Sequence, residues 1–173
     1  MKRSALSLLL GLATVGCAPV TPTGSPTVIE APSSAGDATP AEMASCPVTL
    51  PFGAARRGQE RPFASSALAF GNSHLWVVPI QEDGVIRADS RSVESDGSIS
   101  QKFGWWRITP GTLTISGRRL DAPAPPLRSW IPDGYGSTEF QASDVTFATE
   151  GCWEITGTVG GGNLSFVTFV LRI

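Results

Sequence analysis

The chain of 173 residues carries 13 Lys and Arg against 15 Asp and Glu, which gives a formal net charge of −2 at pH 7. This near balance, without a basic stripe or an acidic block, argues against a nucleic-acid partner and against a surface of Asp and Glu that collects cations. The single histidine, His74, has no second ligand at metal-site spacing, so we expect no metal site and no cofactor. We interpret His74 either as a local hydrogen-bonding residue or as part of a ligand site.

Residues 1–16 have the pattern of an export signal peptide. Lys2 and Arg3 precede an apolar run at residues 5–15, which is too short to span a bilayer as a permanent helix. The run leads into Gly16-Cys17, which resembles the lipobox of bacterial lipoproteins, in which the cysteine is lipidated and becomes the new N-terminus. We therefore predict a lipid on Cys17 that anchors the protein to a bacterial membrane, on the extracytoplasmic face. An ordinary cleaved signal peptide with a chance cysteine is the alternative.

Residues 17–45 are predicted to be a disordered linker that begins at the lipidated cysteine. Proline recurs in this segment, most of its other residues are Ala, Ser, Thr or Gly, and it contains no aromatic residue. Such a segment cannot bury enough apolar surface to offset the chain entropy lost on folding. The remaining residues, 46–173, are enough for a single hydrophobic core. We therefore predict one domain, held clear of the membrane by the linker.

The domain is predicted to be all-β, because helical periodicity is hard to find and short β-rich runs are separated by Gly, Pro, Asn and Asp. This pattern is typical of a single antiparallel β-sandwich or a barrel. In chain order, the predicted strands cover residues 75–80, 85–87, 99–108, 111–120, 127–131 and 145–147, followed by a hairpin within residues 150–173. The segments between them include a turn at Asp83-Gly84, a polar loop at residues 87–100 and a proline-rich crossing at residues 122–126.

The closing hairpin carries the clearest turn signal. Residues 160–163 are three glycines and an asparagine, which tolerate positive φ, and β-favouring residues flank them. In the first arm we place Trp153 and Ile155 on the core face and Cys152 on the opposite face. The second arm has apolar residues at both parities, which predicts a central strand or a bulge.

Cys46 and Cys152 are left as a possible disulfide once Cys17 is assigned to the lipid, because an exported domain reaches a compartment that permits such bonds. A simple alternating sandwich argues against the bond, since it puts the starts of the first and sixth strands at opposite ends, and the two Cα atoms must lie within roughly 7 Å. The irregular run at residues 47–62 could cross that end and resolve the conflict. Two separate buried thiols are the alternative.

A candidate ligand surface combines aromatic and arginine side chains from two strands. Adjacent residues on a strand face opposite sides, so one of Trp105 and Trp106 should enter the core and the other should be displayed or covered. A displayed tryptophan beside Arg107 could stack on a sugar or another partner, and core packing with a cation contact is the alternative. The arginine pair before the proline-rich crossing is either a binding rim or a structural pair, with Asp121 as an ion-pair partner. The candidate residues are Trp105, Trp106, Arg107, Arg118 and Arg119.

Several phrases of the domain resemble, together and in order, a group of functionally uncharacterised bacterial exported proteins, most of them with lipoprotein features. The phrases are CPVT from Cys46, the Leu75-Trp76 strand with its Asp83-Gly84 turn, KFGWWR from Lys102, LTISGRRLDAPAPPL from Leu113, TEGCWEITG from Thr149 and LSFV from Leu164. The resemblance implies export and a β-sandwich of immunoglobulin-like type, and it implies no particular activity. The terminal hairpin is also similar to the last two strands of extracellular immunoglobulin-like modules, which bind or space rather than catalyse.

These features predict a non-catalytic binding or spacer module at the cell envelope, with a glycan or a protein as its ligand and no assigned catalytic residue. An accessory subunit of an envelope complex is one alternative. A hydrolase acting on envelope polymers is the other, and acid/base catalysis of that kind needs two carboxylates across a cleft. The carboxylates available by type are Glu82, Asp83, Asp133, Glu139 and Glu150.

Overall fold

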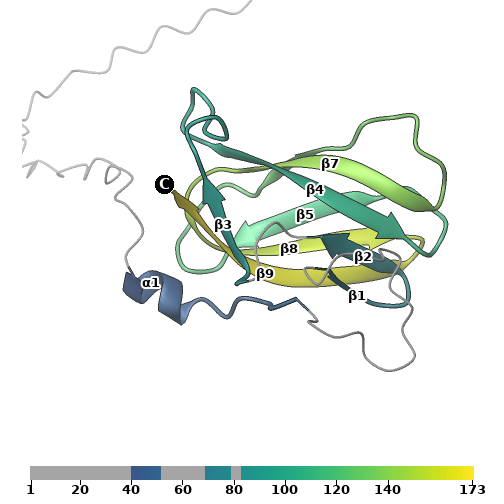
Figure 1. Ribbon diagram of the computed structural model, residues 1–173, viewed down its shortest axis with the longest axis horizontal. Coiled ribbons are helices and arrows are strands. Elements are labelled where there is room, and N and C mark those ends of the chain that lie inside the picture. The colour runs from purple at the N-terminus through teal and green to yellow at the C-terminus, as the bar shows by residue number, and fades with distance from the viewer. Residues whose placement is uncertain (1–39, 52–68, 79–82) are drawn as a thin grey trace, which may run out of the picture. The chain divides into compact units, whose positions relative to one another are not determined.

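The computed structural model describes residues 40–51, 69–78 and 83–173 (Figure 1). The predicted signal peptide, Cys17, most of the linker and Glu82 lie outside the described residues. The elements, in chain order, are α1 (Pro40–Ser45), β1 (Phe70–Gly71), β2 (Leu75–Val78), β3 (Val85–Ala88), β4 (Ile99–Arg107), β5 (Thr114–Arg119), β6 (Arg128–Trp130), β7 (Glu139–Phe147), β8 (Gly151–Val159) and β9 (Gly162–Arg172).

The strands form two sheets that pack face to face as a sandwich (Figure 1). Sheet A has the strand order β1-β2-β4-β7-β6, and sheet B has the order β3-β9-β8-β5. Among the described pairs, all neighbours are antiparallel except β3 and β9, which run parallel. The predicted all-β sandwich of immunoglobulin-like type is confirmed, with one parallel pair added at the edge of sheet B.

Large aromatic side chains from both sheets fill the space between them. Trp105 on β4 and Trp153 on β8 are both 0% exposed. The ring of Phe166 on β9 lies across the sandwich from Trp105, with the ring centroids 6.2 Å apart. A Cβ atom at Gly157 would lie 2.5 Å from the Trp105 ring, so β8 needs a glycine where it passes this indole.

Strand β7 is longer than the strand predicted from the sequence. The prediction is too short because polar residues on the inner face hide the alternation expected of a half-buried strand. Only residues 145–147 are predicted as a strand, whereas β7 pairs with β4 along the whole of both strands. Gln141 and Ser143 face inward and are 4% and 2% exposed. Trp105 Nε1 donates to Ser143 Oγ at 2.9 Å, and Gln141 Nε2 donates to the carbonyl of Pro132 at 3.0 Å. These hydrogen bonds make it possible to bury two side chains that hydropathy assigns to the surface.

The predicted terminal hairpin is confirmed as β8 and β9. Gly160 and Gly161 join the two strands with φ values of 53° and 84°, and a two-residue turn with positive φ at both positions matches the right-handed twist of paired strands. Trp153 and Ile155 are fully buried, as predicted. Strand β9 is a central strand of sheet B, between β3 and β8. Its apolar residues occur at both parities because Phe166 faces the sandwich core, whereas Phe169 on the other face packs in the cluster with Cys46 and Cys152.

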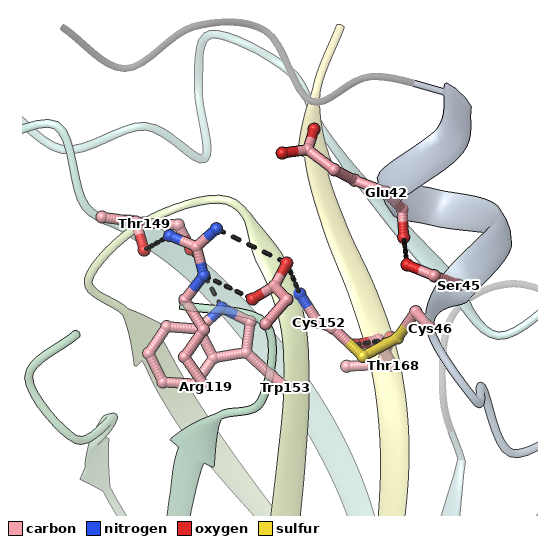
Figure 2. A network of polar contacts seen from close by, with 9 residues as sticks. Glu42, Ser45, Cys46, Arg119, Thr149, Cys152, Trp153 and Thr168 are labelled. Atoms are coloured by element: carbon pink, nitrogen blue, oxygen red, sulfur yellow. Dashed lines mark hydrogen bonds and ion pairs between the residues drawn. A yellow bond between two sulfur atoms is a disulfide. The ribbon is translucent and has the colours of Figure 1, made fainter. Parts of the chain in front are cut away.

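Cys46 and Cys152 form a disulfide with their Cα atoms 5.6 Å apart (Figure 2). The bond is possible because the segment after Cys46 follows the edge of β9 instead of starting a simple alternating sandwich. The Thr49 N–H donates to the carbonyl of Val167 at 2.8 Å, and the Val167 N–H donates to Thr49 Oγ1 at 3.0 Å. This pairing brings the N-terminal segment of the domain to the strand that neighbours β8.

The end of the range predicted as linker, residues 17–45, forms the short helix α1. Its Met43 packs against a small core cluster of Cys46, Cys152, Val85 and Phe169. The helix therefore lies directly before the disulfide and adds to the core of the domain around it (Figure 2).

Candidate binding site on sheet A

The structure places the two tryptophans and the arginine of the KFGWWR segment on different sides of β4. Trp105 faces the core, while Trp106 faces the outer side of sheet A and is partly buried. Arg107 has the same parity as Trp105 and is only 3% exposed. The prediction that one tryptophan enters the core is confirmed, whereas a display of Arg107 beside Trp106 is not what the structure shows.

Arg118 and Arg119 belong to sheet B, away from Trp106 on sheet A. Arg118 Nε lies 2.9 Å from the carboxylate of Glu154 on the neighbouring strand. Arg119 Nε lies 2.6 Å from the carboxylate of Asp121, and its Nη1 donates to Thr149 Oγ1 (Figure 2). The structure thus does not bring the five candidate residues together on one surface, and it gives both arginines of the pair a carboxylate partner.

An exposed aromatic surface lies instead on the outer face of sheet A. Trp106 on β4 is the register partner of Phe140 on β7, and the Phe140 ring lies 6.1 Å from the ring of Tyr135. Trp130 on β6 is the register partner of Asp144 on β7. The exposed fractions are 62% for Trp130, 44% for Phe140 and 41% for Tyr135. Trp106, Trp130, Tyr135 and Phe140 are called the aromatic platform below.

Small and charged residues separate the aromatic side chains of the platform. Gly104 is the register partner of Ala142, and Lys102 is the partner of Asp144. Directly opposed residues of an antiparallel pair face the same side, so both pairs lie on the face that carries the platform. At a rise of about 3.3 Å per residue, the rows of Phe140 and Asp144 lie roughly 13 Å apart. The Phe140 ring extends over Gly104, where a Cβ atom would lie 3.2 Å from it. The platform therefore has a ring that covers this glycine at one end and a charged pair beside Trp130 at the other.

A hollow of about 460 Å³ opens beside the platform. It is lined by Arg107, Gln141 and residues 111–113 and 131–137. Most of the lining comes from the loop between β6 and β7, and Tyr135 belongs both to this lining and to the platform. We call it the Arg107 hollow, and together with the platform it forms one continuous candidate site.

Arg107 is a buried cation in the wall of this hollow. Its Nη1 donates to the carbonyl of Gly111 at 2.9 Å, and its Nη2 donates to the carbonyls of Gly136 and Thr138. Its Nε has no hydrogen-bond partner, and within the described part of the chain no carboxylate lies within 4.0 Å of the guanidinium. Burial lowers the pKa of Arg107, but an arginine side chain in a protein stays protonated. The wall therefore carries a positive charge that no carboxylate of the described residues pairs with.

The loop that forms the hollow ends in a strained backbone conformation. Glu139 has a φ of 68°, a region that residues other than glycine rarely occupy. The bonds from Arg107 to Gly136 and Thr138 hold the chain immediately before this residue. Strain of this kind persists only where the surrounding structure enforces it, and it gathers at binding and catalytic sites. The sequence carries no signal for this feature, because Glu139 has no turn-forming character.

The carboxylates considered for hydrolysis do not converge in the described structure. Asp133 is the only one of them that lines the hollow among the described residues. Asp83 lies 2.7 Å from Arg87 in an ion pair, and Glu150 accepts a hydrogen bond from the backbone N–H of Arg172 at 2.6 Å. In the part of the chain described here, the hollow thus lacks the two facing carboxylates that glycoside hydrolysis requires.

His74 has a local hydrogen-bonding partner. Its Nδ1 lies 2.9 Å from Thr109 Oγ1, and its ring packs so closely on Gly162 that a Cβ atom there would lie 2.3 Å from it. The described residues contain no group of three or more His, Cys, Asp or Glu side chains that could hold a metal ion.

Comparison with known proteins identifies no relative: no family model, no curated protein and no solved structure matches the chain. Within residues 40–51, 69–78 and 83–173, no helix has the length and apolar character needed to cross a membrane. The site itself is therefore the basis for the function proposed next.

Proposed function

We propose that the protein is an exported, lipid-anchored binding module that recognises a glycan with the aromatic platform and the Arg107 hollow. The main support is the gathering of Trp130, Tyr135 and Phe140, each well exposed, on one side of the domain beside a hollow with both polar and apolar lining residues. Single exposed apolar residues are ordinary, but a gathered set marks an interaction surface. The signal-peptide pattern and Cys17 support attachment to the extracytoplasmic face of a bacterial membrane.

A glycan fits the mixture of side chains at this site. Sugar rings have apolar C–H faces and polar hydroxyl edges, and aromatic rings offer a flat surface for the former at a small entropy cost. The hydroxyl of Thr112 and the amide of Gln141, both in the lining of the hollow, are suited to bonding the hydroxyl edges. The single carboxylate in the lining supports binding without hydrolysis.

Glycan binding is tested with the full exported protein in a zwitterionic detergent, because sugar-based detergents would compete for the site. An array of bacterial envelope and plant polysaccharide fragments identifies a binder, and calorimetry measures its affinity. We expect Trp130→Ala and Tyr135→Ala each to weaken binding about tenfold, since buried aromatic contacts dominate binding energies. Leu120→Ala removes a side chain that is 37% exposed but lies outside the platform, so it serves as the matched control. An array without any binder would contradict the proposal.

The anchor has its own test. We expect Cys17→Ser to abolish the incorporation of a labelled fatty acid and to release the protein from the membrane fraction. The acyl chains on Cys17 would provide the apolar surface that holds the protein to the membrane, and the linker has no comparable apolar segment. The binding affinity of the released protein should equal that of the anchored form. Equal fatty-acid labelling of both proteins would remove Cys17 as the lipid site.

A further inference from the structure

We infer that the Arg107 hollow selects saccharides that carry a carboxylate over their neutral counterparts. This inference rests on the proposed glycan binding and names the class of ligand. It starts from the charge of Arg107, which the described part of the chain leaves without an anionic partner.

The guanidinium is an unusual group to bury in this way. Charged side chains are rarely buried without a counter-ion, because their removal from water costs several kcal/mol. Arg107 is 3% exposed, and its described partners are the neutral carbonyls of Gly111, Gly136 and Thr138. Its Nε donates to no group in the described part of the chain. A carboxylate that entered the hollow would supply the missing charge where water screens it little.

Among the described residues, two acidic side chains lie near the hollow, and neither neutralises Arg107. Asp133 lines the hollow but is exposed, so water screens its charge. Glu139 is the register partner of Arg107 on β7, and it too is exposed and not part of the lining. Both lie farther than 4.0 Å from the guanidinium nitrogens. Water therefore screens the positive charge of the buried Arg107 only weakly, whereas it strongly screens the negative charge of the exposed Asp133.

The site favours a saccharide over an acidic peptide for two reasons. Peptides often bind by adding a strand to a free sheet edge, but the outer edge of β5 is already covered. The carbonyl of Gly117 accepts the Leu127 N–H at 3.2 Å, and the carbonyl of Ile115 accepts the Ser129 hydroxyl at 3.1 Å. In addition, Tyr135 joins the hollow to the platform, which suits a chain of rings that stack.

The test compares tetramers of galacturonic and glucuronic acid with the matching tetramers of galactose and glucose, together with a short oligoglutamate peptide. Calorimetry uses the full exported protein in zwitterionic detergent at low and at high salt. We expect at least one acidic tetramer to bind about tenfold more tightly than its neutral partner at low salt, because hydrogen bonds to charged groups are the stronger ones. The ratio should fall as salt rises.

Each other outcome overturns a defined part of the account. The inference is overturned if acidic and neutral tetramers bind equally. It is also overturned if the array finds a glycan that binds but none of these tetramers binds. In both cases the proposed glycan binding itself still holds. If oligoglutamate binds more tightly than any saccharide, the ligand of the hollow is an acidic peptide and not a glycan. Failure of every saccharide, on the array as well as here, overturns the proposed function itself.

Three substitutions at two positions, Arg107 and Asp133, test whether the hollow causes the preference for acidic saccharides. We expect Arg107→Gln to reduce the ratio of acidic to neutral affinity to about one, whereas Arg107→Lys should keep part of it. Arg107 also holds the loop between β6 and β7, so either variant could fail to fold. Asp133→Lys changes an exposed position and therefore provides a second test that does not depend on Arg107. It should raise the same ratio severalfold by adding positive charge to the lining. A ratio that Asp133→Lys leaves unchanged would show that the hollow does not contact the carboxylate.

Discussion

At the scale of single residues, the carboxylate of Asp121 connects β5 to the start of β8. It accepts Arg119 Nε at 2.6 Å and the backbone N–H of Cys152 at 3.0 Å, beside the disulfide (Figure 2). Burial raises the pKa of Asp121, but the hydrogen bonds from Arg119 and Cys152 outweigh this effect and hold the pKa below its ordinary value of 3.8. A carboxylate with a depressed pKa stabilises the fold at pH values above its unfolded pKa, and the stabilisation is lost as the pH falls through the folded-state pKa.

We therefore predict that Asp121→Asn lowers the free energy of unfolding by about 1–3 kcal/mol at neutral pH, because a partly buried hydrogen-bonded charge pair is broken. Urea denaturation should show this difference shrinking as the pH falls below about 4, because the unfolded chain protonates this carboxylate first, and vanishing below the depressed pKa of the native carboxylate. Asp89→Asn is the control, since the Asp89–Arg91 pair is largely exposed and its loss should have little effect. A difference that stays constant from pH 7 to the acid range would contradict this role of Asp121.

The same scale shows why the candidate site was only partly predictable. The period of two along a strand indicates that one of Trp105 and Trp106 is buried, but the choice between them depends on which face of β4 meets sheet B. The burial of Arg107 has no local signal at all. It depends on three carbonyl groups that come from residues 111–138, and these meet the guanidinium only in the folded chain.

At the scale of elements, the disulfide holds α1 and the first residues of the domain against β8. The bonded residues are 106 positions apart. In the chain-entropy model, closing a loop of about 100 residues stabilises a protein by about 4–5 kcal/mol. Both cysteines are buried in the small cluster that Met43 completes, so their removal also costs packing.

We predict that the double variant Cys46→Ala, Cys152→Ala is less stable by about 2–5 kcal/mol. Thermal denaturation measures the loss, and protease cleavage near α1 should become faster because the segment is no longer held covalently. A free-thiol count on the native protein, with and without reductant, provides the control. Equal free-thiol counts and equal gel mobility with and without reductant would show that the protein in solution has no disulfide between Cys46 and Cys152.

Element prediction succeeded where local chemistry decides the structure and failed where tertiary contacts decide it. The glycines of the closing hairpin and the alternation in β5 are local signals, and both elements are present. Most of β7 was missed because Gln141 and Ser143 look like surface residues until their partners are known. Helix α1 was missed because its residues read as linker, while its Met43 is held by a cluster formed around the disulfide.

At the scale of the whole molecule, the disulfide and the Arg107 hollow lie at opposite ends of β8. Cys46 is bonded to Cys152 at the start of β8, whereas the far end of β8 lies next to Gly111 in the lining of the hollow. Cys152 and Val159 are seven positions apart along β8, which separates these points by roughly 23 Å at a rise of about 3.3 Å per residue. The proposed linker would thus join the domain at the end of β8 that lies far from the hollow.

The aromatic platform is the central claim, and the indole N–H resonances of the five tryptophans test it most directly. Spectra of the labelled protein are recorded during titration with a glycan fragment that the array has identified. Trp130, and with it Trp106, should shift in a saturable manner, because both belong to the platform, whereas the buried Trp105 and Trp153 should keep their positions. Saturable shifts confined to Trp105 and Trp153, or none at any indole under conditions where calorimetry detects binding, would place the ligand elsewhere on the domain.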